Sequence, residues 1–138
     1  MMIHKTVLLH CPIDAAFQLF TSRISEWWPA SHRLTKDPES ELFLEPSGRF
    51  WERARDGRVA ELGRVLSWEA PHRLLLDFFM GTNPDQPTSL EVVFSREGEG
   101  TLLTIHHRAK PESESLWDQR APVFERSWDS VLAVLAQR

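Results

Sequence analysis

The second half of this chain constrains its fold most, because strand-like segments follow one another there with only tight turns between them. From Gly48 to Arg108, alternating apolar and polar residues run between glycine- and proline-containing turns, and Asp56-Gly57 is a strong hairpin signal. Strands joined by tight turns pair antiparallel, since parallel pairing requires a long crossover. The sequence therefore predicts one antiparallel sheet of about six or seven strands, which must curve or twist.

An aromatic-rich helix is expected to close the chain. Phe124 and Trp128 belong to a set of apolar residues at helical spacing that also includes Trp117, Ala121, Val131, Leu132 and Leu135. Because proline removes a helical hydrogen bond and clashes with the preceding turn, Pro122 predicts a helical turn at 115–120 and a main helix that begins near Pro122. Such a helix, laid across the concave face of the sheet, would enclose an apolar space.

The first third of the chain adds a strand and two short helices. Residues 3–10 predict a strand, Pro12 opens a helix, and a second short helix ends before Pro29. Residues 31–40 are polar and show no period, which predicts an exposed loop that could cover an opening. The remaining strands are expected at 41–45, 49–55, 59–68, 73–80, 88–95 and 101–108, with a turn-rich loop at 81–87. Together these elements predict an α+β domain.

Length and charge exclude several classes of protein. The 138 residues are expected to form one domain over 1–138. A net charge of −4, with acidic and basic residues interleaved, offers no basic surface for nucleic acid. The start of the chain lacks the pattern of a signal peptide and no apolar run could span a bilayer, so we expect a cytoplasmic protein that makes no membrane contact. Cys11 is the single cysteine, which excludes an internal disulfide and predicts a small buried residue beside a strand end.

Several short motifs, in order and in register, resemble one protein family. The chain is similar to the START-like superfamily, also called SRPBCC or helix-grip, and within it to bacterial relatives of the activator of the ninety-kilodalton heat-shock protein's ATPase. The motifs are Glu26-Trp27-Trp28-Pro29, residues 48–53 with Asp56-Gly57, residues 63–74, Gly100-Thr101 leading to His107-Arg108, and Ser127-Trp128 with Val131-Leu132. The resemblance implies a helix-grip fold with an elongated cavity between the sheet and the last helix, used across the superfamily for lipids, sterols, polyketides and other hydrophobic molecules.

Strand alternation and this resemblance together predict a ligand-binding set. Alternate residues of the strands face inward and, with the last helix, would line the cavity or pack as an ordinary core. The predicted ligand-binding residues are Trp28, Phe50, Glu52, Leu76, Phe78, Leu90, Val92, Ile105, His107, Phe124 and Trp128.

Glu52 and His107 are the polar members of this set. A buried carboxylate or imidazole is costly unless it has a partner. They could orient a ligand or act as acid and base, but no third group completes a catalytic set, so a structural role is favoured. In that role Glu52 would pair with an arginine such as Arg53 or Arg64 near the rim, and His107 would form hydrogen bonds within the fold. His106 and His107 point to opposite faces of a strand and cannot share a metal ion in the usual way, and we expect no metal and no cofactor.

Three functional hypotheses stay open. The first is non-catalytic binding of a hydrophobic or aromatic small molecule. The second is a chaperone-associated or stress-response interaction module, for which an exposed Trp27-Trp28 pair would form the contact patch. Buried, the same pair would instead anchor the short helices or close one mouth of the cavity. The third is a cyclase- or aromatase-like enzyme that uses Glu52 or His107. Homodimerisation through an exposed sheet edge or a helix is also open.

Overall fold

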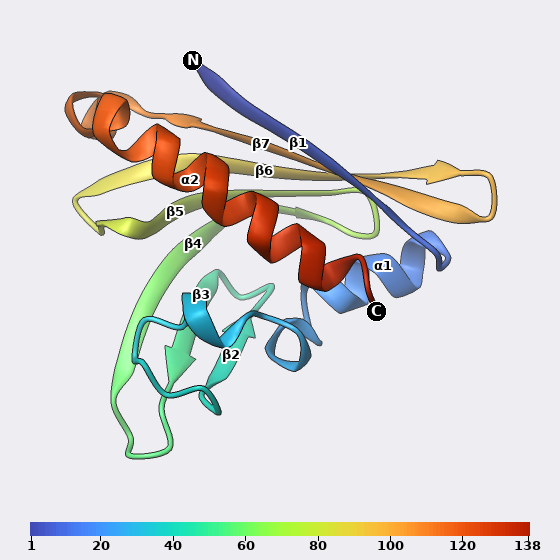
Figure 1. Cartoon of the computed structure of the whole chain (residues 1–138), viewed down its shortest axis with the longest axis horizontal. Coiled ribbons are helices and arrows are strands. Elements are labelled where there is room, and N and C mark those ends of the chain that lie inside the picture. Colours follow the sequence, from blue (N-terminus) through green and yellow to red (C-terminus); the bar gives the residue numbers. More distant parts are fainter.

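The seven strands form one antiparallel sheet in which most sequence neighbours are also neighbours in space. In the computed structural model, which describes all 138 residues, the sheet order is β1-β7-β6-β5-β4-β3-β2 (Figure 1). The strands are β1 (Met2–Leu9), β2 (Glu41–Leu44), β3 (Arg49–Arg53), β4 (Val59–Glu69), β5 (Arg73–Asn83), β6 (Gln86–Glu97) and β7 (Gly100–Ala109). Only β1 is out of sequence order, because it pairs with β7. The predicted sheet and its strand number are therefore confirmed.

Irregular pairing bends the sheet at three places. The register shifts between Phe50 and Trp51, between Val65 and Ser67, and across the end of β5 beyond Phe78. Bulges of this kind increase the local twist and bend the strand. Figure 1 shows β4 sweeping away from β5 toward β3 and β2. The sheet thus acquires the concave face that the sequence predicts.

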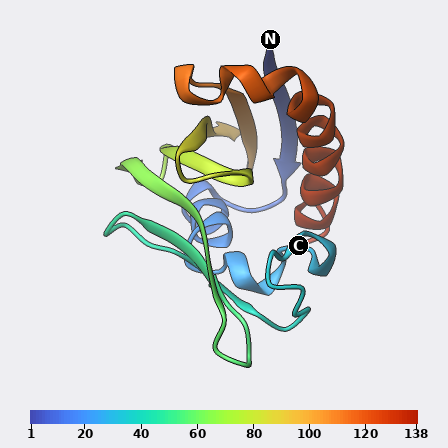
Figure 2. The same ribbon diagram turned by 90° about the vertical axis from the view of Figure 1, so that its left-hand side faces the viewer.

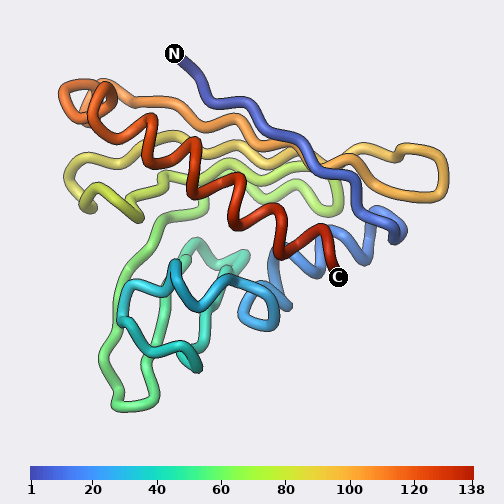
Figure 3. Tube along the Cα trace, viewed as in Figure 1, coloured from blue at the N-terminus to red at the C-terminus, as the bar shows by residue number.

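Helical segments lie on the concave side. They are α1 (Ile13–Phe20), the short 3₁₀ helices η1 (Ile24–Glu26), η2 (Ala30–His32) and η3 (Pro111–Ser113), and the long α2 (Glu114–Leu135). Figure 3 shows the C-terminal end of α2 reaching the segment that follows α1, where the guanidinium of Arg138 lies 3.2 Å from the carboxylate of Glu26. No helix of the protein is long and apolar enough to cross a lipid bilayer.

The helix α2 is continuous through Pro122, so the predicted helix start near this proline is wrong. Pro122 is exposed, and so is Asp118, whose carbonyl loses its helical partner because proline has no amide hydrogen. Water can satisfy a carbonyl on the outer face, which lets the helix tolerate the proline there. Figure 2 shows α2 changing direction where its first turns, in orange, pass into the red remainder. The proline therefore lies in a bent helix rather than at a boundary.

The predicted loop at 81–87 is mostly strand. β5 extends to Asn83 and β6 begins at Gln86, so only Pro84 and Asp85 form the turn. The Asn83 side chain donates a hydrogen bond to Gln86 at 2.9 Å and accepts one from the Asp85 amide at 3.0 Å. Gly81 has a φ of 81°, a conformation that favours glycine, at the irregular end of β5. Pairing between β5 and β6 therefore extends into this segment despite its turn-forming composition.

The predicted exposed loop at 31–40 is only partly exposed. Leu34 and Lys36 face outward, but Arg33, Thr35, Asp37 and Ser40 are all at most 8% exposed. Polar composition does not imply solvent exposure here, because these buried groups find hydrogen-bond partners within the fold.

The interior follows the predicted alternation of the strands. All the residues assigned to the inward face of β3, β5, β6 and β7 are buried, and the apolar ones join residues of α1 and α2 in a single apolar cluster. Glu52, Thr88 and His107 are polar groups with 0% exposure on this face. Cys11 is half-buried beside the end of β1, and its partial burial raises the pKa of the thiol.

Candidate functional site

A cavity of about 380 Å³ opens between α2, the end of β5 and the segment from Trp28 to Lys36. Its lining is mixed, with aromatic and aliphatic side chains together with basic and hydroxyl groups. The lining residues are Trp28, Ser31, His32, Arg33, Leu34, Lys36, Phe78, Met80, Gly81, Arg120, Val123, Phe124, Ser127, Trp128 and Val131. We call this space the cavity throughout.

One face of α2 supplies six of the lining residues, as many as the segment from Trp28 to Lys36. Arg120, Phe124 and Trp128 are spaced four residues apart, and Val123, Ser127 and Val131 form a second row beside them. Residues three and four positions apart lie on the same side of a helix. The helix therefore presents a continuous stripe to the cavity only because it runs unbroken through Pro122.

Aromatic rings form the inner wall. The Trp28 and Trp128 rings meet edge to face at a centroid distance of 6.4 Å, and Phe78 lies 6.0 Å from Trp128. The Trp28 indole donates a hydrogen bond to the carbonyl of His32 at 3.1 Å, which fixes the ring. Rings held in edge-to-face contact have little freedom to collapse into a neighbouring space. This wall can accept a flat apolar molecule without first rearranging.

His107 lies behind the aromatic wall in a chain of hydrogen bonds. The Trp128 indole N–H donates to Nδ1 of His107 at 3.0 Å, so Nδ1 carries a lone pair and the proton is on Nε2. Nε2 then donates to the Thr88 hydroxyl at 2.7 Å, and that hydroxyl donates to the carbonyl of Phe78, also at 2.7 Å. Every donor in this chain has one acceptor, which leaves no imidazole nitrogen available to a ligand.

Burial keeps His107 neutral. Desolvation lowers the pKa of this imidazole from 6.5 to about 3. The prediction that His107 makes hydrogen bonds within the fold is confirmed. Use of His107 as an acid or base would require breaking this network, so the geometry gives no support to that role.

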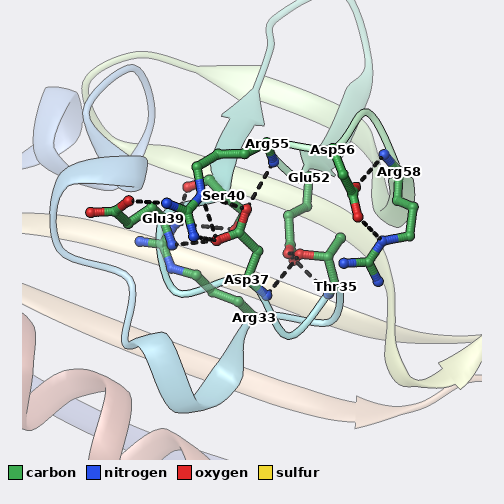
Figure 4. Close-up of polar contacts among 9 residues, drawn as sticks. All are labelled: Arg33, Thr35, Asp37, Glu39, Ser40, Glu52, Arg55, Asp56 and Arg58. Atoms are coloured by element: carbon green, nitrogen blue, oxygen red, sulfur yellow. Dashed lines mark hydrogen bonds and ion pairs between the residues drawn. The ribbon is translucent and has the colours of Figure 1, made fainter.

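Glu52 holds the 31–40 segment against β3 (Figure 4). Its carboxylate accepts hydrogen bonds from the Leu34 amide at 2.9 Å, the Thr35 amide at 3.0 Å and the Thr35 hydroxyl. The predicted pairing of Glu52 with Arg53 or Arg64 is wrong, because Arg53 pairs with Glu41 across the outer face and the Arg64 guanidinium lies over the Phe79 ring. Alternation along β3 places Glu52 and Arg53 on opposite faces, which excludes that pair.

Two further contacts fix the same segment. Asp37 lies 2.9 Å from the Arg55 guanidinium and also accepts the Arg55 amide at 2.8 Å, and the Arg55 hydrogen bonds lower the pKa of this carboxyl to about 2 (Figure 4). The Arg33 guanidinium donates to the carbonyls of Trp28, Ser25 and Ser40. The part of the cavity rim formed by residues 31–36 is thus anchored rather than loose.

The structure divides the predicted ligand-binding residues into two groups. Trp28, Phe78, Phe124 and Trp128 line the cavity. The others are buried outside its lining: Phe50, Glu52, Leu76, Leu90, Val92, Ile105 and His107. Trp27 and Trp28 are 3% and 4% exposed, which excludes this pair as an exposed contact patch.

Sequence reasoning missed the rim of the cavity. Arg120 and Ser127 lie one helical turn from the predicted Phe124, and Val123 lies one turn before Ser127, so helical spacing was a sufficient signal. The expected break at Pro122 assigned Arg120 to a different element. Met80 and Gly81 were also missed, because the sequence predicted a strand that ends at Met80 and a loop that begins at Gly81.

Together, the concave antiparallel sheet, the helix laid across it and the cavity between them define a helix-grip domain. A sequence profile of the family described as activator of Hsp90 ATPase homolog 1-like protein matches residues 10–138. The chain belongs to this family. A search of curated proteins gives no match to this chain.

Several solved structures are similar. The anthrahydroquino-gamma-pyrone synthase Txn09, solved as a complex, is 31% identical, with 85% of this chain and 82% of that chain covered and a TM-score of 0.57. The self-sacrificing resistance protein CalC of Micromonospora echinospora is 21% identical, with coverages of 99% and 92% and a TM-score of 0.74. The Hsp90 activator PFC0360w of Plasmodium falciparum is 18% identical, with coverages of 80% and 74% and a TM-score of 0.55. The last two show the shared fold.

Proposed function

We propose that this protein binds a hydrophobic, aromatic small molecule in the cavity without transforming it. The observation that carries the proposal is the cavity of about 380 Å³ walled by Trp28, Phe78, Phe124 and Trp128. A ligand site is typically concave, mostly apolar and largely preformed, and a few polar groups orient the ligand. The anchored 31–36 segment and the fixed indole of Trp28 supply the preformed part.

The buried polar groups support binding over chemistry. Glu52 and His107 each have partners within the fold and neither lines the cavity. The relative Txn09 supports a small-molecule role because it is 31% identical and is named as the synthase of an anthrahydroquino-gamma-pyrone.

An enzymatic role is the second candidate, because Txn09 is named a synthase. In this chain the acid or base would be His32, which lines the cavity and has a hydrogen bond of 2.9 Å with the Ser31 hydroxyl. Partial burial lowers the pKa of His32, which favours the neutral, basic form. A His32→Gln variant that binds an identified ligand normally but no longer converts it would establish this role.

Native mass spectrometry of the purified protein, followed by denaturing extraction, tests the main proposal. A stoichiometric aromatic adduct that is released unchanged is the expected result. An empty protein calls for titration with a neutral fluorescent probe, N-phenylnaphthylamine.

A cavity-blocking variant shows where the probe binds. Ser127 lines the cavity and Ser130 is exposed on the same helix, so Ser127→Trp and Ser130→Trp form a matched pair. Ser127→Trp is expected to weaken probe binding at least about tenfold, since the indole occupies the ligand volume. Equal affinity in the two folded variants would place binding elsewhere and contradict the proposal.

A further inference from the structure

The cavity lining contains three basic residues and no acidic residue. Arg33, Lys36 and Arg120 are among the lining residues, while no Asp or Glu is. The chain as a whole has a net charge of −4, so long-range attraction would not bring an anion here. A local concentration of positive charge in an acidic protein favours a negatively charged group at this position.

Lys36 and Arg120 differ from most other basic residues of the chain, because neither has a carboxylate partner. Ion pairs within 4.0 Å engage nine of the other lysines and arginines: Lys5, Arg23, Arg49, Arg53, Arg55, Arg58, Arg73, Lys110 and Arg138. Arg33, the third basic residue of the lining, already donates to three backbone carbonyls. Lys36 and Arg120 are therefore the cations of the lining that remain available.

Arg120 is held in place while one of its donors stays unsatisfied. Its guanidinium carbon lies 5.5 Å from the centroid of the Phe124 ring, and a Cβ built on Gly81 would lie 2.9 Å from Nη2 of Arg120. Gly81 thus permits the close approach of the arginine to β5. Nε of Arg120 is buried without a hydrogen-bond partner, as is the hydroxyl of Thr82 next to Gly81. A buried charged donor without an acceptor is costly.

We propose that the ligand of this cavity is an aromatic acid, whose anionic group pairs with Arg120 while its ring system packs against Trp28, Phe78 and Trp128. Lys36 adds a second positive charge at the rim. A guanidinium matches the planar geometry of a carboxylate, and charge-assisted hydrogen bonds are stronger than neutral ones. The inference rests on the proposed function, since it names the chemical class of the molecule that the cavity binds.

Two probes with nearly the same ring system separate the two proposals. N-phenylnaphthylamine is neutral, and anilinonaphthalene sulfonate carries one permanent negative charge on the same aromatic frame. The wild-type protein is expected to bind the sulfonate about tenfold more tightly than the neutral probe, as one charge-assisted contact allows. If the neutral probe binds and the sulfonate binds no better, the acid specificity is wrong while the proposed function stands. If neither probe binds, both fail.

Variants on one helix locate the charge. Arg120→Met keeps an unbranched apolar stem and removes the guanidinium with its charge, and Arg126→Met is the control because Arg126 is exposed, has no ion pair and does not line the cavity. Arg120→Met is expected to weaken sulfonate binding about tenfold with neutral-probe binding retained, and Arg120→Lys should restore part of the loss. An equal effect of Arg120→Met and Arg126→Met overturns the assignment.

Should Arg120→Met not fold, ionic strength and Lys36→Met provide the readout. Lys36 is exposed, so its truncation leaves the core intact. Sulfonate affinity in the wild-type protein should fall with added NaCl and be lower in Lys36→Met, whereas neutral-probe affinity should not change. Sulfonate binding that is insensitive to both changes contradicts the proposal.

Discussion

The core behind the aromatic wall and the cavity in front of it differ in how many of their buried polar groups have hydrogen-bond partners. Behind the aromatic wall, Trp128, His107 and Thr88 form a chain in which each donor has an acceptor. On the cavity side, Nε of Arg120 is buried without a hydrogen-bond partner, and the hydroxyl of Thr82, next to Gly81 of the lining, also has none. The same helix therefore closes the core with one part of its surface and leaves a binding surface with another. Unsatisfied polar groups mark the site, whereas buried polar groups with full partners mark the scaffold.

The largest expected effect of a single substitution lies in the core behind the aromatic wall, which we call the closed part. Leu90→Ala removes a side chain with 1% exposure and should lower the free energy of unfolding by about 3 kcal/mol, because it leaves a cavity in the core. Since Leu90 does not line the cavity, probe affinity in the folded variant should stay within about twofold of wild type. Urea denaturation and probe titration measure the two quantities. Loss of probe binding in a folded Leu90→Ala variant would contradict the separation of the core from the cavity.

Glu52→Gln tests the anchor of the rim. The amide group would face the Leu34 and Thr35 N–H donors with a donor of its own, so stability should fall by about 2 kcal/mol. The control is Glu41→Gln, which removes an exposed ion pair with Arg53 and should cost less than about 1 kcal/mol. The two variants are compared by urea denaturation. Equal costs would show that the buried carboxylate does not anchor the segment.

The pH dependence of stability reports on His107. The folded pKa is about 3, below the unfolded value of 6.5, so the unfolded chain takes up a proton that the folded protein does not. This contribution is complete above pH 6.5 and is lost as the pH falls toward 3, at about 1.4 kcal/mol per pH unit. His107→Leu is less stable overall, and its stability should fall less steeply with acidification. Parallel curves for the two proteins would show that His107 is not held neutral.

A smaller effect separates backbone strain from contact at the cavity. Gly81→Ala and Gly98→Ala both place a Cβ at positive φ, and each should cost about 1 kcal/mol for that reason. Only at Gly81 would the Cβ meet Arg120 and Phe124, both at 2.9 Å, whereas Gly98 has nothing within 4 Å. Gly81→Ala should therefore destabilise the protein further and alter probe affinity, while Gly98→Ala leaves affinity unchanged. Thermal unfolding and probe titration of both variants decide the point.

The closed part was predictable from sequence because its signals are local. Alternation along β5 and β6 placed Leu76, Leu90 and Val92 on the inner face, and the structure buries all three. Period-two patterning determines the side of a sheet on which a residue lies, regardless of how the sheet then curves.

The rim of the cavity was not predictable to the same degree. Arg120 joins the lining only because α2 continues through Pro122, whose exposed position decides the question and is not visible in sequence. Glu52 was recognised as a buried acid, but its partners are the backbone amides of Leu34 and Thr35 and the Thr35 hydroxyl, and no sequence pattern predicts these contacts. The 31–40 segment belongs to the site because of where the fold places it, and its polar composition does not predict that placement.

The most direct test follows the indole N–H signals in a two-dimensional nitrogen–proton NMR spectrum while N-phenylnaphthylamine is added. The chain has six tryptophans, assigned by single Trp→Phe substitutions, and only Trp28 and Trp128 line the cavity. Both indoles donate ordered hydrogen bonds, to His32 and His107, so a ligand beside them must shift their signals. The largest shifts are expected at Trp28 and Trp128, with Trp51 and Trp68 unchanged. Largest shifts at Trp51 or Trp117, with Trp28 and Trp128 unmoved, would contradict binding in this cavity.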